Sequence, residues 1–130
     1  MIELYSNNVV VATNASIPFN TITLKKGCST VESGTSSVNL RQNGIYLVSV
    51  NASALAQAAG DVSIQLYVNG QAQPQAFASA TGTTTDIVNL SFMTLVQVYD
   101  CNCKPTVLTV MNTAQTATFD NINLVAYKIC

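Results

Sequence analysis

The strongest constraint in the sequence is an alternation of apolar and polar residues with a period of two. Between Asp61 and Val68 every second residue is Val, Ile or Leu, and polar or aromatic residues fill the positions between them. This pattern is typical of a half-buried β-strand. Asn69-Gly70 then supplies the positive φ angles of a two-residue type I′ turn, so Gln71 to Ser79 is expected to return as the partner strand. Pro74 has no N–H to donate, which predicts that the returning strand is an edge strand or carries a bulge.

The same alternation predicts strands along nearly the whole chain, separated by short turns rich in Gly and Asn. The further predicted strands are Ile2–Ser6, Val9–Thr13, Ser16–Leu24, Cys28–Ser33, Ser37–Leu40, Ile45–Ala54, Thr84–Val98, Thr106–Asn112 and Asn121–Ile129. Only Ala52–Gly60 has a helix-forming composition, and it is too short to be a stable helix by itself. We therefore expect one all-β domain over residues 1–130, folded as a sandwich or barrel.

Several predicted strands carry apolar residues on both faces. In the strand that ends at Val98, Met93 and Leu95 point away from a second set of apolar residues. One sandwich core accounts for only one of these faces, and no helix is predicted to cover the other. The pattern therefore predicts self-association, with Met93 and Leu95 in the interface. The alternative is that these are ordinary scattered surface hydrophobic residues.

The five tyrosines could stack on sugars if their rings reach the surface, but most are expected in the core or in an interface. Tyr67 and Tyr127 lie on the less apolar faces of their predicted strands. A ring in such a position buries a large area when a partner covers it, and its hydroxyl then finds a hydrogen-bond partner. We therefore add both tyrosines to the predicted interface.

Four segments, taken in order, resemble one known family. They are IPFNT at Ile17–Thr21, NGIYLVSV at Asn43–Val50, GDVSIQLYVNGQ at Gly60–Gln71 and the closing strand NINLVAYKI. They resemble the C-terminal globular domain of collagen-like spore-surface glycoproteins, which is similar in fold to the jelly rolls of tumour necrosis factor and of the complement globular heads. The resemblance runs from Ser16 to Ile129. It implies a two-sheet jelly-roll sandwich that packs as a homotrimer around a threefold axis.

The resemblance also implies a place on the surface of a particle, either a spore or a tailed-phage virion. The sequence has no collagen-like Gly-X-Y stalk. This favours a phage or prophage head-fibre, decoration or tail-tip protein over an exosporium-like spore-surface protein. The expected partners are further copies of the chain, other virion or surface proteins and, as an alternative function, host-surface glycans bound by the same trimer. The acidic start of the chain does not resemble a secretory signal, so we expect synthesis in a bacterial cytoplasm.

Charge and hydropathy exclude two classes of partner. Charged residues make up 8% of the chain, against about 25% in an average soluble domain. The five Lys and Arg residues are scattered, so no basic patch is available to neutralise a run of phosphates, and nucleic-acid binding is not expected. No apolar run approaches the roughly 20 residues of a membrane-spanning helix, so no membrane partner is expected either.

The chain offers little for catalysis. It contains no histidine, which removes the usual general base of serine and cysteine triads. The acidic residues are dispersed; they are Glu3, Glu32, Asp61, Asp86, Asp100 and Asp120. A glycosidase would need two of them in one cleft. Calcium could bind near Asp100, Asn102, Asp120 and Asn121, although Asn and Asp also serve as ordinary turn residues. We expect a protein that is not an enzyme and has no cofactor or metal.

The four cysteines leave three alternatives open. They are Cys28, Cys101, Cys103 and Cys130. Disulfides within or between subunits would suit an exposed particle, and the even number of cysteines is compatible with them. Reduced thiols are the second alternative. A zinc site is the third and has the weakest signal, because a single C-x-C with two remote thiols does not match the usual spacing of structural zinc ligands.

Overall fold

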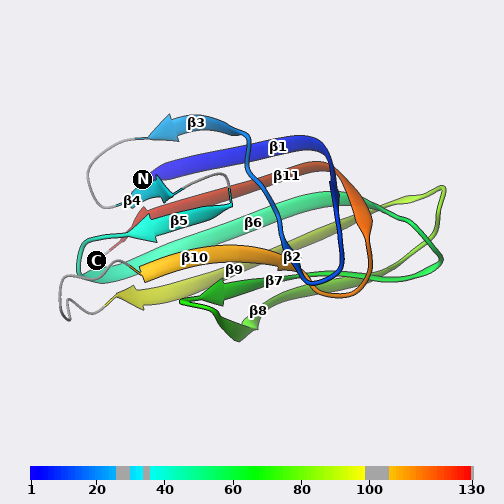
Figure 1. Ribbon diagram of the computed structural model, residues 1–130. Helices are drawn as coiled ribbons and strands as arrows, with labels where there is room; N and C mark the ends of the chain where they lie inside the picture. The colour runs from blue at the N-terminus through cyan, green and yellow to red at the C-terminus, as the bar shows by residue number, and fades with distance from the viewer. Residues whose placement is uncertain (26–29, 34–35, 99–105, 130) are drawn as a thin grey trace.

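Two antiparallel β-sheets pack face to face (Figure 1). The computed structural model describes residues 1–25, 30–33, 36–98 and 106–129. Sheet A contains, in spatial order, β3 (Thr21–Lys25), β1 (Ile2–Val11), β11 (Ala117–Lys128), β6 (Gly44–Ala56) and β9 (Ile87–Val98). Sheet B contains β4 (Thr30–Ser33), β5 (Ser37–Leu40), β10 (Thr106–Asn112), β7 (Gly60–Val68) and β8 (Gln71–Gly82), and β2 (Ala15–Ser16) pairs with β10. The predicted all-β sandwich is confirmed, and its topology is that of a jelly roll.

Strands that are distant in the sequence are neighbours in sheet A. β1 pairs with β11 from Ile2 opposite Ala126 to Val11 opposite Ala117. β11 in turn pairs with β6, and β6 pairs with β9 over its whole length. Both chain termini consequently lie at the same end of the sandwich (Figure 1).

The β7–β8 hairpin forms as its sequence predicts. Asn69 and Gly70 have φ angles of 52° and 80°, which is the left-handed pair that a type I′ turn requires. The Asn69 side chain also accepts a hydrogen bond of 2.9 Å from the backbone N–H of Val107. Pro74 lies on β8, the edge strand of sheet B, opposite a register shift in β7. A proline in this place removes no hydrogen bond from the interior of a sheet.

The predicted turn at Asn7-Asn8 is wrong, because β1 runs through it without interruption. Asn8 has a φ of 53°, a conformation that asparagine tolerates better than most residues. Asn8 has no partner in the register with β11, and Asp120 on the opposite strand is also passed over. Because the two irregularities face each other, the alternation of inward and outward side chains shifts by one residue in both strands at the same place. Both strands therefore keep apolar residues in the core.

The predicted strand Ser16–Leu24 is broken by a crossing between the two sheets. Its start pairs with β10 in sheet B, and Thr21 begins β3 in sheet A. Pro18 lies between these parts, where it cannot donate a backbone hydrogen bond. Ser6 fixes the crossing: its hydroxyl donates to the Pro18 carbonyl at 2.8 Å and accepts from the Asn20 N–H at 2.8 Å. The remaining predicted strands are present with boundaries shifted by a few residues.

The core fills the space between the sheets with the buried half of each alternating strand. Its largest fully buried side chains come from both sheets and include Tyr46, Phe119, Ile2, Leu4, Ile64, Leu66, Leu108, Ile122 and Leu124. Tyr46 keeps its hydroxyl satisfied by donating to the Gln42 carbonyl at 2.8 Å. Among the described residues there is no helix of the length and apolarity needed to cross a membrane.

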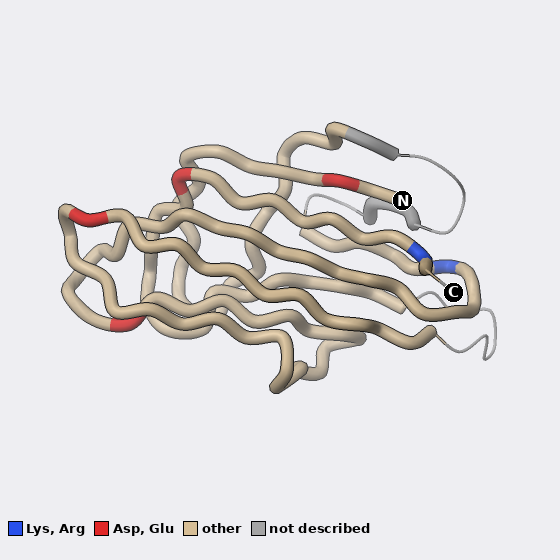
Figure 2. Tube along the Cα trace, turned by 180° about the vertical axis from the view of Figure 1, so that it is seen from behind, with Lys and Arg blue, Asp and Glu red and all other residues tan. Residues whose placement is uncertain are grey.

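Among the described residues, the charged positions lie mostly at the two ends of the sandwich (Figure 2). Arg41 and Lys128 are exposed near the ends of β6 and β11 where the termini lie. Asp61, Asp86 and Asp120 are exposed at strand ends and turns toward the opposite end. The middle of each sheet is therefore poor in charge.

A buried asparagine ties the two sheets together. Asn112 ends β10 in sheet B and is fully buried, and its side-chain Nδ2 donates to the Val11 carbonyl at 2.9 Å and to the Gln115 carbonyl at 2.7 Å. The Asn112 carbonyl also accepts a bond of 2.7 Å from the Asn14 N–H. The side chain of Asn112 thus joins the end of β1 to the loop after β10, and its backbone carbonyl holds the entry to β2.

We predict that Asn112→Leu lowers the free energy of unfolding by about 1–3 kcal/mol, because buried carbonyls lose their donor without regaining water. Urea unfolding followed by circular dichroism measures this change. Asn20→Leu is the matched control, because Asn20 is exposed, and it should alter stability by less than about 0.5 kcal/mol. Equal stability of the two variants would contradict a structural role for the Asn112 amide.

Candidate interaction site on the outward face of sheet A

The outward face of sheet A presents the half of each strand that does not enter the core. The strand register arranges these side chains in rows across the sheet. In order along the strands the rows are Leu95–Leu47–Tyr127, Met93–Ser49–Val125–Glu3, Ser91–Asn51–Asn123–Tyr5, Asn89–Ser53–Asn121–Asn7 and Ile87–Leu55–Thr118–Val10. The face therefore has a definite pattern: apolar residues at both ends of the strands and amides in the middle.

The first apolar band consists of Leu47, Met93, Leu95, Val125 and Tyr127. Met93 is 64% exposed and Leu95 is 56% exposed, and the other three are half-buried. Neighbouring large apolar side chains that are this exposed are characteristic of an interaction surface. Three of the four residues predicted for an interface, Met93, Leu95 and Tyr127, lie together in this band.

The second apolar band consists of Val10, Leu55 and Ile87. Val10 is 69% exposed and Ile87 is 54% exposed, and they lie on different strands with Leu55 and Thr118 between them. This band is smaller than the first and lies toward the end of the sandwich that carries Asp86. A partner that covers both bands must also cover everything between them.

Between the bands lies an asparagine belt, which we define as Asn51, Ser53, Asn89, Ser91, Asn121 and Asn123. These side chains line a hollow of about 350 Å³ in the face of the sheet. The Ser53 hydroxyl donates to Asn89 Oδ1 at 3.0 Å. Within the described residues, the side chains of Asn51, Asn121 and Asn123 make no hydrogen bond. The belt therefore presents unused donors and acceptors.

The five rows contain one charged side chain, Glu3. Its carboxylate accepts a hydrogen bond of 2.6 Å from Thr23 Oγ1 of the neighbouring strand β3. Charged groups resist burial in an interface unless they are paired. With a single charge held toward one side, these five rows oppose their own burial very little.

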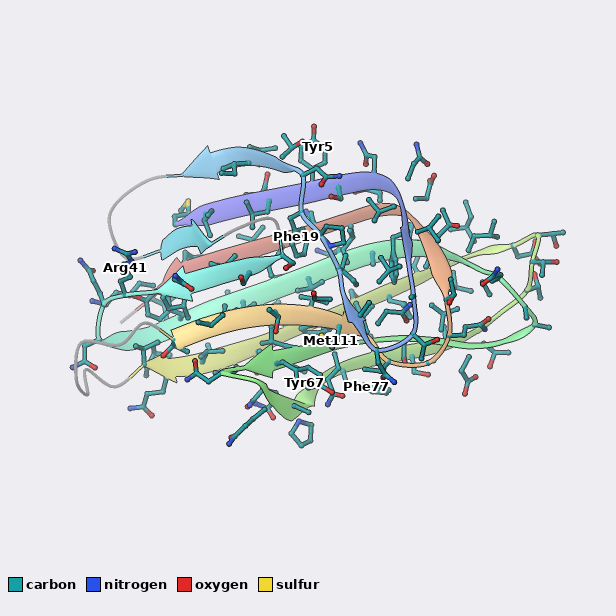
Figure 3. All side chains as sticks on the ribbon, viewed as in Figure 1. Tyr5, Phe19, Arg41, Tyr67, Phe77 and Met111 are labelled. Carbon is teal, nitrogen blue, oxygen red and sulfur yellow. The ribbon has the colours of Figure 1, made fainter. Side chains whose placement is uncertain are left out.

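Tyr67, the fourth residue predicted for an interface, lies on the other sheet. Figure 3 shows Tyr67, Phe77 and Met111 near one another on the outward side of sheet B. In the register Gln65 faces both Phe77 and Met111. Phe77 is 46% exposed, whereas Tyr67 and Met111 are half-buried. The structure thus separates Tyr67 from the other three predicted residues by the thickness of the sandwich.

Among the residues that the structure describes, the remaining candidates form no site. Cys28, Cys101, Cys103 and Cys130 lie outside the described residues, as do Asp100 and Asn102. Within the part of the chain that the structure describes, no three His, Cys, Asp or Glu side chains are grouped as metal ligands would be. Asp61 accepts a hydrogen bond of 3.2 Å from Thr81 Oγ1 across the β7–β8 hairpin, which is an ordinary cross-strand contact.

The asparagine belt was missed by the sequence predictions, although a signal for it is present. Three strands each contribute two Asn or Ser residues separated by one position: 51 and 53, 89 and 91, and 121 and 123. This spacing places each pair on one face of its strand. The local pattern does not say that the three pairs meet, because that depends on pairing between segments far apart in the sequence.

No protein-family model and no curated protein sequence matches the chain. Solved structures do match it over nearly its full length. The Eiger TNF of S. frugiperda has a TM-score of 0.74 at 16% identity, covering 99% of this chain and 92% of that one. The globular domain of zebrafish complement 1qA has a TM-score of 0.74 at 10% identity, covering 99% and 96%. The PRD1 vertex protein P5 has a TM-score of 0.64 at 14% identity, covering 99% and 96%.

These identities are low, so the similarity concerns the fold. It extends over both sheets, because almost every residue of the chain is covered in each comparison. It also agrees with the resemblance carried by the four sequence segments. The chain therefore has the jelly-roll fold of the tumour-necrosis-factor and complement globular domains.

Proposed function

We propose that the chain is a non-catalytic structural module that forms a homotrimer through the outward face of sheet A and serves on the surface of a virion or similar particle. The observation that carries this proposal is the pair of apolar bands on a sheet whose other face already fills the core. Glu3 is the one charge in the rows of this face. A second copy of the same chain offers an equally uncharged surface.

The exposed side chains supply a driving force for association. Burying a Leu, Ile or Met side chain completely is worth about 1.5–3 kcal/mol. Association costs about 4–15 kcal/mol in lost freedom of motion, so one such residue is not enough and two offset only the lower end of this range. The two bands together provide eight apolar residues on one face, so their combined burial can exceed the cost.

The number of subunits and the location on a particle rest on different support. The trimer is what the resemblance to the spore-surface, tumour-necrosis-factor and complement jelly rolls implies. A virion location is supported by the structural similarity to the PRD1 vertex protein P5, whose name places it at a particle vertex. A spore-surface role is the alternative. The lack of histidine supports a non-catalytic role.

Light scattering coupled to size exclusion tests the assembly, and we expect the mass of three chains both with and without reductant. Packing alone should hold the trimer, because the apolar bands do not depend on the cysteines. A three-chain mass seen only without reductant would show that disulfides, and not packing, hold the trimer together. A monomer in both buffers would overturn the proposal.

Met93→Lys/Leu95→Lys should raise the dissociation constant of the trimer at least about a hundredfold, because each ammonium would be buried without a partner charge. Sedimentation at a series of concentrations measures it, and circular dichroism checks the fold. Phe77→Lys is the control, since it adds a charge to an equally accessible apolar position on sheet B. A double variant that stays trimeric like the control would show that the interface lies elsewhere.

Immunogold electron microscopy tests the location. Antibodies raised against the folded protein should label particles released by the source cells at discrete surface sites. Labelling that is confined to spores would favour the spore-surface alternative. Particles that carry no label, from cells shown to make the protein, would contradict a structural role on a virion.

Glycan binding is the second candidate function, and the group formed by Gln65, Tyr67, Phe77 and Met111 on sheet B favours it. Sugar sites combine apolar or aromatic surface with a few fixed polar groups. Here the exposed Phe77 ring lies beside the Gln65 amide, whose Nε2 donates to the Gln73 carbonyl at 3.1 Å. This surface would stay free in a trimer that assembles through sheet A.

Phe77→Ala should weaken binding of a neutral glycan about tenfold or more, because the ring is the largest exposed apolar surface in this group. A glycan array followed by titration of the best ligand measures the change. Ile22→Ala, at an exposed residue of β3 outside both apolar bands, is the control and should leave glycan affinity unchanged. An array without signal would remove this second function and leave the structural proposal intact.

A further inference from the structure

The asparagine belt lies between the two apolar bands, so a partner that covers both bands encloses it. We propose that the belt fixes the register of the subunits along the strand direction and thereby limits the assembly to one stoichiometry, through hydrogen bonds between side-chain amides of different copies. This inference rests on the proposed assembly through sheet A. It concerns a different property, because the apolar bands provide affinity and the belt selects among possible arrangements.

The amides of the belt have hydrogen-bonding capacity that the described residues of the subunit leave unused. Asn51, Asn121 and Asn123 make no side-chain hydrogen bond there, and each carboxamide carries two N–H donors and one oxygen acceptor. In an isolated subunit water satisfies these groups. Once the bands on either side are covered, each amide must bond to another copy, directly or through a water in the hollow of about 350 Å³, or remain unsatisfied in an enclosed site.

The rows of the sheet determine which side chains meet. A rotation axis parallel to the strands keeps each row at the same height in every copy. The belt of one subunit then meets the belt of the next, and each apolar band meets an apolar band. In this register every amide has amides or hydroxyls of another subunit at its own height.

A displaced register loses this match. Moving one subunit by two residues along the strands, about 6.6–6.8 Å, places the row of Asn51 and Asn123 opposite the row of Met93 and Val125. Part of the amide row is then enclosed against Met93 and Val125, which cannot bond to it, so fewer hydrogen bonds form than in the aligned register. The apolar bands by themselves oppose such a shift only weakly, because Leu, Met, Val and Ile can replace one another as contacts.

A single buried asparagine acts in this way in coiled coils, where it specifies register and oligomeric state at a cost in stability. The present belt is broader, since it draws two residues from each of three strands. Its position on rigid strands also gives its amides fixed directions. Replacing belt amides with apolar residues should therefore strengthen association while it removes the preference for one arrangement.

The test compares the wild type with Asn51→Leu/Asn123→Leu, a double change of similar volume in the belt. Native mass spectrometry gives the stoichiometry. A photoreactive benzoylphenylalanine at position 93 reports the register through the peptide that it cross-links in the neighbouring subunit. We expect one three-chain species and one cross-linked segment for the wild type. The double variant should show at least two stoichiometries, or cross-links that spread to positions two residues away.

Gln71→Leu/Gln75→Leu is the control, because it replaces two exposed amides on β8 of sheet B and should behave as the wild type. A belt variant with a single three-chain mass and the wild-type cross-links would overturn this inference and leave the proposed trimer standing. A monomeric wild type would instead overturn both. The two failures are thus distinguishable.

Asn51→Asp provides a second test that keeps the size of the side chain. Enclosure and repulsion between copies should raise the pKa of the new carboxyl above its usual value of about 3.9. The assembly should therefore form near pH 4 and weaken at least tenfold as the pH rises to 7. Gln75→Glu, at an exposed position on sheet B, should show no such dependence, and an Asn51→Asp variant that assembles equally well at both pH values would contradict an enclosed belt.

Discussion

The register in which β11 pairs with β6 and β6 pairs with β9 determines which side chains are buried in the core and which lie on the outward face of sheet A. Side chains alternate along these strands, apart from the irregularity at Asp120 in β11, so one row enters the core and the next faces outward. A slip of one residue in either pairing would exchange the two sets and place Met93 and Leu95 on the inside. The core on one side and the interaction face on the other are consequently two results of the same backbone hydrogen bonds.

Local signals predicted the parts of the structure that local chemistry controls. Asn69-Gly70 forms its turn and Pro74 lies on an edge strand because each depends on the backbone of a few neighbouring residues. The prediction at Asn8 was wrong because an Asn pair usually indicates a turn. Here a matching irregularity at Asp120, on a strand more than a hundred residues away in the sequence, lets β1 continue through Asn8. Tyr67 and Tyr127 look equivalent in the sequence, and only long-range pairing assigns them to opposite sheets.

The interaction face shows the same division between local and long-range information. The outward direction of Met93 and Leu95 follows from alternation alone, so the first apolar band was partly visible in the sequence. The asparagine belt was not, although its paired positions are, because the belt exists only where β6, β9 and β11 align. Residue types thus predicted the apolar contacts proposed to provide affinity. The belt proposed to fix the register could be identified only from the pairing of the strands.

The pairing of β1 with β11 has a consequence for synthesis of the chain. A ribosome releases β1 first, but the neighbour of β1 in the middle of sheet A emerges only after more than a hundred further residues. Sheet A therefore cannot close before β11 has emerged, and until then the nascent chain carries unpaired strand edges and uncovered apolar rows. Folding of this topology is a late and comparatively slow event. Chaperone protection of the growing chain would matter more for this sandwich than for a domain of equal size built from local contacts.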